Sequence, residues 1–214
     1  AEVIIANPAG VNVDGAGFIN ASRATITTGA PVVNGGNLEG YRVQRGTVTI
    51  NGKGLDATLT DYTGILARAV QVNAGVWAKD LKVATGVNDI SADQNGVTPT
   101  AASGPAPGFA LDVAKLGGMY AGKIFLVGTE AGVGIRNSGV IGASAGDVVL
   151  QTNGWLTNSG QISGARLDLT ATDLDNRGGK IAQLGSQRLD IQLGQLQNAA
   201  GQIGFDAVAA SPSP

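Results

Sequence analysis

The sequence predicts an all-β fold, a parallel β-helix in which short strands stack coil upon coil. Three recurring features predict it. Asparagines recur at intervals of 21, 18 and 22 residues, at positions 137, 158, 176 and 198. Isoleucines recur in step at intervals of 21, 19 and 22 residues, at positions 141, 162, 181 and 203. Alternating apolar segments lie between them, at 148–150, 167–169 and 189–191. A repeat period near 20 residues is typical of solenoid proteins.

Stacking explains why such short strands are useful. One strand buries almost nothing alone, but coils about 4.8 Å apart pair in parallel and align their apolar side chains in ladders. Asn and Gly at the corners tolerate left-handed backbone, so we expect them to turn the chain. The leucine-rich repeat pattern is absent. A β-sandwich, the alternative, does not explain why corner and core residues recur together.

The composition agrees with a thin core that contains few aromatic rings, and it excludes several classes of function. Glycine makes up 34 of 214 residues and apolar residues 43%, whereas charged residues make up 14%. The net charge of −2 leaves no basic footprint for nucleic acid. The chain has no Cys and no His, which removes disulfides, Cys and His metal ligands and the commonest general base. We therefore expect no metal and no cofactor. No apolar run is long enough for a membrane helix.

The first half of the chain reads as irregular coils. Residues 2–6 form a strand, and Asn7 to Gly10 form a turn in which Pro8 fixes φ and Gly10 can adopt positive φ. A glycine-punctuated link follows, and then short strands at 18–21 and 23–28. Residues near 31–50 are rich in Gly and Pro and are expected to leave the coil. Within them, residues 41–44 and 47–50 alternate and are expected to pair as a hairpin.

The remaining elements follow at coil-like spacing. Residues 51–54 turn the chain. Strands are expected at 55–59, 65–72, 76–77, 81–84, 109–113, 119–120 and 123–127. Residues 86–108 hold three prolines and are expected to form a long loop or extra-helical hairpin. Three segments result: irregular coils over 1–134, regular repeats of about 20 residues over 135–204, and a flexible tail over 205–214.

One motif resembles a known family. The run Asn7-Pro-Ala-Gly-Val11, followed by Gly17-Phe-Ile-Asn20, is similar to the Asn-Pro-Asn-Gly-Ile…Gly-Phe-Ile-Asn motif of filamentous-haemagglutinin-like exoproteins. These are the TpsA proteins of bacterial two-partner secretion, which include adhesins and CdiA-type contact-dependent inhibition toxins. Segments 64–81 and 116–134 look like the same family. Leu174-Asp-Asn-Arg-Gly-Gly-Lys-Ile181 resembles its haemagglutinin repeats.

The resemblance implies a right-handed β-helix that serves as a secretion (TPS) domain. Its implied partner is the outer-membrane TpsB transporter, whose POTRA domains recognise the unfolded chain in the periplasm. The protein would then fold outside, secreted or at the bacterial cell surface, and host or bacterial surfaces become further partners. Because the family's first coils would lie upstream, residues 1–134 are expected to be a partial TPS domain.

The resemblance also assigns site residues. Asn7, Pro8 and Gly10 would belong to the secretion motif recognised by the transporter. The sequence departs from the motif at Ala9 and Val11, and Val13 and Ala16 stand where many relatives carry a Cys pair. The alternative from the residues alone is that Asn7 and Pro8 only close a coil, so that their substitution would impair folding.

Two other functional classes remain open. A β-helix carbohydrate-active enzyme needs clustered carboxylates. Asp168 and Asp190, however, occupy equivalent repeat positions and indicate a solvated row, so we expect no catalytic residue. A glycan-binding or host-binding adhesin module would need a platform. Trp155, at a corner preceded by Gly, is the candidate ligand platform, with a packing role as its alternative. The 86–108 excursion is the other place where binding could lie.

The first strand has a further consequence. A solenoid exposes an unpaired parallel edge at each end unless it is capped. We expect the edge at residues 2–6 to self-associate or to pair with a partner.

Overall fold

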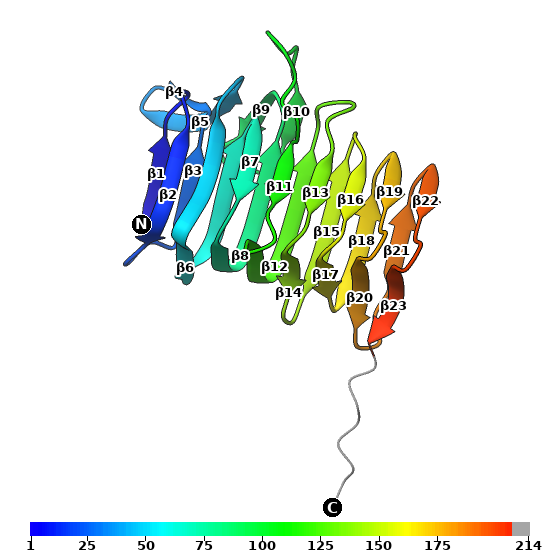
Figure 1. The fold of residues 1–214 in the computed structure, drawn as a ribbon. Helices are drawn as coiled ribbons and strands as arrows, with labels where there is room; N and C mark the ends of the chain where they lie inside the picture. The colour runs from blue at the N-terminus through cyan, green and yellow to red at the C-terminus, as the bar shows by residue number, and fades with distance from the viewer. Residues whose placement is uncertain (207–214) are drawn as a thin grey trace, which may run out of the picture.

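The computed structural model describes residues 1–206. It is a solenoid of about nine turns in which 19 of the 23 strands pair in parallel with strands of neighbouring coils (Figure 1). No helix occurs in this part of the chain, so none could cross a membrane. The predicted all-β, right-handed parallel β-helix with extra-helical hairpins is therefore confirmed as the fold class.

The strands form three parallel stacks. The first stack contains β1 (Glu2–Ala6), β3 (Arg23–Thr27), the ends of β6 (Thr47–Ala67), β8 (Gly75–Thr85) and β12 (Gly118–Gly128), then β15 (Asp147–Thr152), β18 (Arg166–Thr170) and β21 (Leu189–Gln192). The second contains β2 (Val11–Gly17), the start of β6, β7 (Ala69–Val72), β11 (Leu111–Val113), β13 (Ile135–Asn137), β16 (Leu156–Asn158), β19 (Asp173–Asp175) and β22 (Gln195–Gln197).

The third stack joins the other two. It contains the end of β2, the middle of β6, the starts of β8 and β12, then β14 (Val140–Ala143), β17 (Gln161–Gly164), β20 (Lys180–Leu184) and β23 (Gln202–Asp206). Each stack therefore has one outer face, and successive coils place equivalent residues side by side on it.

The core lies between the stacks and consists of ladders. One ladder in the first stack passes in register through Ile5, Ile26, Ile65, Val83, Leu126, Leu150, Leu169 and Ile191. Its middle members are almost fully buried, whereas Ile5 is 41% exposed because β1 is the first strand of its stack. This apolar burial is the main favourable term in the folding of the solenoid.

A second, antiparallel sheet lies beside the solenoid, at the top of Figure 1. It is formed by β4 (Ala30–Asn34), β5 (Asn37–Val43), β9 (Asn88–Ser91) and β10 (Val97–Pro99), with β5 pairing with both β4 and β9. It has its own small core, in which Tyr41, Val43 and Ile90 pack against Leu66 and Ala84 of the solenoid. Two excursions far apart in the sequence thus form one sheet.

The structure corrects several predicted elements. The hairpin of 41–44 with 47–50 is wrong: β5 pairs with β4 and β9, and residues 47–50 open β6 and pair in parallel with β2 and β7. Residues 11–17 are a strand and not a link. Residues 18–21 are not a strand, because Asn20 turns the chain with φ of 57°. Of the predicted tail, Phe205 and Asp206 belong to β23, and residues 207–214 lie outside the described residues.

The repeated asparagines also differ from the prediction. They do not supply left-handed backbone: beside them, Gly178 and Ala200 have positive φ. Instead their side chains point inward as a hydrogen-bonded ladder. The Nδ2 of Asn137 donates to Oδ1 of Asn158 (2.8 Å), and Asn158 and Asn176 donate onward to Asn176 and Asn198 (2.7 Å each). Buried amides need such partners, since an unpaired one is costly.

Candidate functional site

The Asn7–Gly10 motif forms the corner between β1 and β2. The backbone amide of Gly10 donates to the carbonyl of Asn7 (3.0 Å), and the Ala9 amide donates to Oδ1 of Asn7 (3.1 Å). Gly10 has φ of 137°, a value that favours glycine. The predicted turn is therefore present, and the Asn side chain itself stabilises it.

The corner rests on the next coil. The Asn7 amide donates to the carbonyl of Thr27 (3.0 Å). Gly46, with φ of 87°, lies under the corner, where an added Cβ would meet the Pro8 carbonyl oxygen at 2.8 Å and Thr28 at 2.9 Å. Asn7, Pro8 and Ala9 nevertheless remain exposed. The motif is thus a rigid, polar and accessible turn, suited to recognition by another molecule.

Next to this corner lies β1, the first strand of the solenoid within residues 1–206. Within residues 1–206, β1 pairs only with β3, and β2 only with β6, so one edge of each strand is unpaired. Ile4 and Ile5 are 37% and 41% exposed. The backbone hydrogen-bonding groups on this edge of β1 and its apolar side chains are therefore both available to another chain. In Figure 1, β1 is the blue strand at the N-terminal end.

Trp155, the predicted ligand platform, lies far from this corner. Its ring is half-buried and covers Gly134, where a Cβ would meet ring atoms at 2.1 Å. The edge of Phe109 packs against it, with ring centroids 5.3 Å apart. A shallow depression of about 290 Å³ adjoins the ring. Trp155 thus packs against Gly134 and Phe109, and its ligand role stays a prediction.

That depression contains a carboxylate pair which sequence reasoning missed. Asp173 and Asp175 flank buried Leu174 on β19 and so point to the same outer face. Arg177 holds Asp175 through a 2.6 Å ion pair, whose hydrogen bond lowers the pKa of the Asp175 carboxyl. The D-x-D spacing was the signal that could have found them. Both carboxylates therefore belong to solvated positions, and Asp175 is held ionised.

Asp168 and Asp190 form a second row of carboxylates on an outer face of the solenoid. Asp168 and Asp190 are register partners on β18 and β21, as their equivalent positions in the repeat suggest. Asp168 lies 3.6 Å from Arg166, and Asp190 lies 2.7 Å from Arg188. Each carboxylate is thus paired with a base on its own coil. Among residues 1–206, no three His, Cys, Asp or Glu side chains gather as metal ligands.

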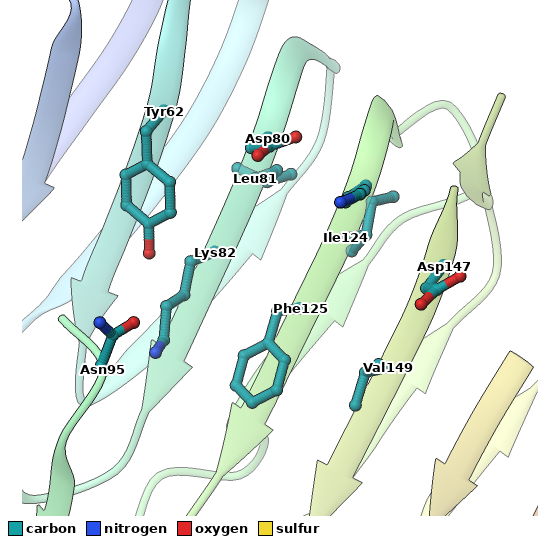
Figure 2. A pocket seen from close by; sticks show the side chains of 10 residues that line it. Tyr62, Asp80, Leu81, Lys82, Asn95, Ile124, Phe125, Asp147 and Val149 are labelled. Carbon is teal, nitrogen blue, oxygen red and sulfur yellow. The ribbon is translucent and has the colours of Figure 1, made fainter. Parts of the chain in front are cut away.

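A groove lies on the outer face of the first stack, beside the β9–β10 hairpin. Figure 2 shows its lining, with Tyr62, Lys82 and Asn95 at one end and Phe125 and Val149 on the following strands; its volume is about 390 Å³. The Lys82 ammonium donates to the Gln94 carbonyl and lies 4.8 Å from the Phe125 ring centroid.

The hairpin tip covers this end of the groove. Arg23 donates to the carbonyls of Ala92 and Asp93 at 3.3 and 3.0 Å, and its guanidinium lies over the Tyr62 ring. Burial raises the pKa of Tyr62 to about 12. Lys82 and Arg23 thus donate hydrogen bonds to the carbonyls of the hairpin turn. These hydrogen bonds join the hairpin turn to β3 and β8, and the sequence alone gave no sign of them.

Comparison with known proteins identifies the class. The family model of the TPS secretion domain matches residues 1–163, more than half of the chain. The chain therefore belongs to the TPS secretion domain family. A crystal structure of the filamentous hemagglutinin secretion domain is similar to it, with a TM-score of 0.65 and 30% sequence identity over 96% of this chain and 66% of that one.

The relatives narrow the class to CdiA-like and filamentous-haemagglutinin-like exoproteins. The chain is 55% identical to "Toxin CdiA" of Yersinia pestis over 167 residues, which is 78% of this chain. It is 50% identical to "tRNA nuclease CdiA-2" of Burkholderia pseudomallei over 166 residues, which is 77% of this chain. The chain spans about 5% of the length of these relatives.

Proposed function

We propose that this domain is recognised by an outer-membrane TpsB transporter and then nucleates β-helix folding outside the cell. The observation that carries the proposal is the corner of Asn7, Pro8 and Gly10 beside β1, which is closed by its own hydrogen bonds and exposes Asn7 and Pro8. Passage through the periplasm, recognition by POTRA domains and final location at the cell surface belong to the same proposal.

The pairing order supports the nucleation step. β1 and β2 have no partner until β3 and β6 arrive, and each later coil adds to the one before it. A chain that emerges N-terminal end first can therefore add one coil at a time. Apolar burial and ladder pairing make each added coil costly to unfold, which opposes return through the transporter.

We also propose that the domain acts without chemistry of its own. Of the acidic residues described above, Asp168, Asp175 and Asp190 pair with arginines. Turnover of an acidic polysaccharide that is lost on Asp173→Asn or Asp175→Asn substitution would contradict this part of the proposal.

A pull-down tests transporter recognition. The chain unfolded in urea is diluted over immobilised POTRA domains of its transporter, and the bound fraction is compared between wild type and Asn7→Ala. We expect Asn7→Ala to bind less. Asn37→Ala is the matched control, since Asn37 is an exposed asparagine at the start of β5, outside the motif.

Refolding separates recognition from simple turn formation. If Asn7→Ala binds POTRA domains like wild type but refolds more slowly, Asn7 and Pro8 only close a coil, and the recognition role is wrong. If binding falls while refolding is unchanged, recognition is supported.

A further inference from the structure

We propose that the outer face of the third stack carries a binding platform for a neutral pyranose chain, formed by Asp56, Trp77 and Tyr120. These residues are register partners on β6, β8 and β12, so they lie in one row along the solenoid axis. The site is separate from the secretion motif and from Trp155.

The two rings are held flat and open. Trp77 folds back over Gly75, where a Cβ would meet its ring at 2.3 Å, and Tyr120 covers Gly118 in the same way at 2.5 Å. The ring planes differ by 16° and their centroids lie 6.2 Å apart. Trp77 and Tyr120 are 41% and 40% exposed. One face of each ring therefore rests on glycine backbone, and much of the rest is free.

The neighbouring positions in the row complete the platform. Gly142 is the register partner of Tyr120 on the next coil and adds no side chain, so the flat strip continues beyond the rings. At the other end, Thr58 donates to Oδ1 of Asp56 from its backbone (3.1 Å) and its hydroxyl (2.6 Å). These bonds lower the Asp56 pKa. No hydrogen bond within residues 1–206 ends on Oδ2.

This arrangement favours a neutral sugar chain over other ligands. A pyranose ring has a flat C–H face that stacks on aromatic rings, and its hydroxyls donate to a carboxylate. Coils repeat about every 4.8 Å, close to the length of one sugar unit, so successive units can lie on successive rings. An ionised Asp56 disfavours acidic glycans. Cations are usually enclosed by several rings, whereas here the two rings lie side by side.

Fluorescence can report this site alone, because the chain has only two tryptophans. In a Trp155→Phe variant, Trp77 is the sole tryptophan. We titrate it with xylohexaose, cellohexaose, maltohexaose, polygalacturonate and choline chloride. We expect a saturable change with at least one neutral oligosaccharide and none with the last two. The reciprocal Trp77→Phe variant, which reports Trp155, should show no change.

Blocking the strip tests the site without touching its rings. A Cβ on Gly142 meets nothing closer than 3.6 Å, so Gly142→Gln is accommodated but crowds Tyr120. Gly204 lies in the same row three coils further on, with nothing within 4 Å, and Gly204→Gln is the matched control. We expect Gly142→Gln and Tyr120→Ala to weaken binding about tenfold or more, and Gly204→Gln to leave it unchanged.

The proposal is overturned if no neutral oligosaccharide gives a saturable signal from Trp77. Binding only of choline or only of polygalacturonate overturns it as well, as does binding that Gly142→Gln leaves intact. A negative result in these titrations does not change the result expected in the POTRA pull-down, because the platform and the Asn7 corner lie on different faces.

Discussion

One inward ladder of the second stack changes from apolar residues to asparagines along the solenoid axis. The change shows how a single residue type alters the hydrogen bonding of the core. The ladder reads Val13, Ile50, Val72 and Val113 in register, and then continues as Asn137 and Asn158. Each inner asparagine donates to the next and accepts from the one before. Asn137 Oδ1, at the junction, faces Val113 and is a buried acceptor without a partner within residues 1–206.

The ladder therefore predicts that the same Asn→Val substitution lowers the free energy of unfolding by different amounts at Asn158 and Asn137. Asn158→Val strands Oδ1 of Asn176 and the Lys180 carbonyl, and should lower the free energy of unfolding by about 1–3 kcal/mol. Asn137→Val should cost less, because it also removes an unpaired oxygen and packs on Val113. Urea unfolding followed by circular dichroism measures both. An equal or larger loss for Asn137→Val would show that the amide ladder does not contribute as described.

The β9–β10 hairpin is the element whose position depends most on distant residues. Gln94, at its tip, has φ of 62°, and its Nε2 donates to Thr25 on β3 (2.8 Å). Its side chain covers Gly64, where a Cβ would meet Oε1 at 2.2 Å. Lys82 donates to the carbonyl of the same Gln94. A turn near residue 94 thus becomes part of the outer face of β3, β6 and β8.

Lys82 should make this attachment depend on pH. Burial holds the pKa of its amine below the ordinary 10.5. The folded state therefore binds this proton less tightly than the unfolded state, so the penalty is present at neutral pH. It disappears as the pH rises through the lowered pKa toward 10.5. The stability of wild type relative to Lys82→Met should thus increase over that window, measured as the difference in urea midpoints. A difference that is constant with pH would contradict the burial of a charged amine.

At the scale of the whole solenoid, residues 1–206 leave one edge of the first strand, β1, unpaired. The Ile5–Ile191 ladder has no cover beyond Ile5, and β1 has one unpaired edge within the described residues. Because parallel edges pair readily, we predict that this end binds a second copy of the chain or a partner strand.

Sedimentation velocity over a range of concentrations tests this prediction. Wild type should self-associate, and Ile5→Lys should be monomeric, because a charge at the end of the core is costly to bury. Val33→Lys is the control, since Val33 is 59% exposed on β4, which pairs with β5 and not with β1. A monomeric wild type whose Val3 to Ile5 amides exchange slowly would contradict it.

Much of the fold could be predicted because each coil of a solenoid repeats nearly the same spacing of core residues. Ile141, Ile162 and Ile181 recur at nearly one period and are stacked in register, as their spacing indicates. The irregular coils were harder. Residues 11–17 contain two glycines and so resemble a link, yet β6 supplies a parallel partner and makes them a strand. Residues 47–50 alternate like half of a hairpin, and only the neighbouring coils reveal the parallel pairing.

The candidate sites divide in the same way. The Asn7–Gly10 turn could be predicted, because Asn, Pro and Gly each restrict or extend the local backbone in a known direction. The flat placement of Trp77 and Tyr120 could not, since it depends on Gly75, Gly118 and the register between β8 and β12.

The sequence by itself thus determined the repeat, the inward apolar ladders and the turn at Asn7, because each follows from local geometry and periodic apolar burial. Tertiary structure decided the role of the asparagines, the joining of residues 30–43 and 88–99 into one sheet, and the rows of side chains on each outer face. These depend on which residue lies one coil away, about 20 or more positions distant along the chain. That relation is set by packing and register, which no short window of sequence contains.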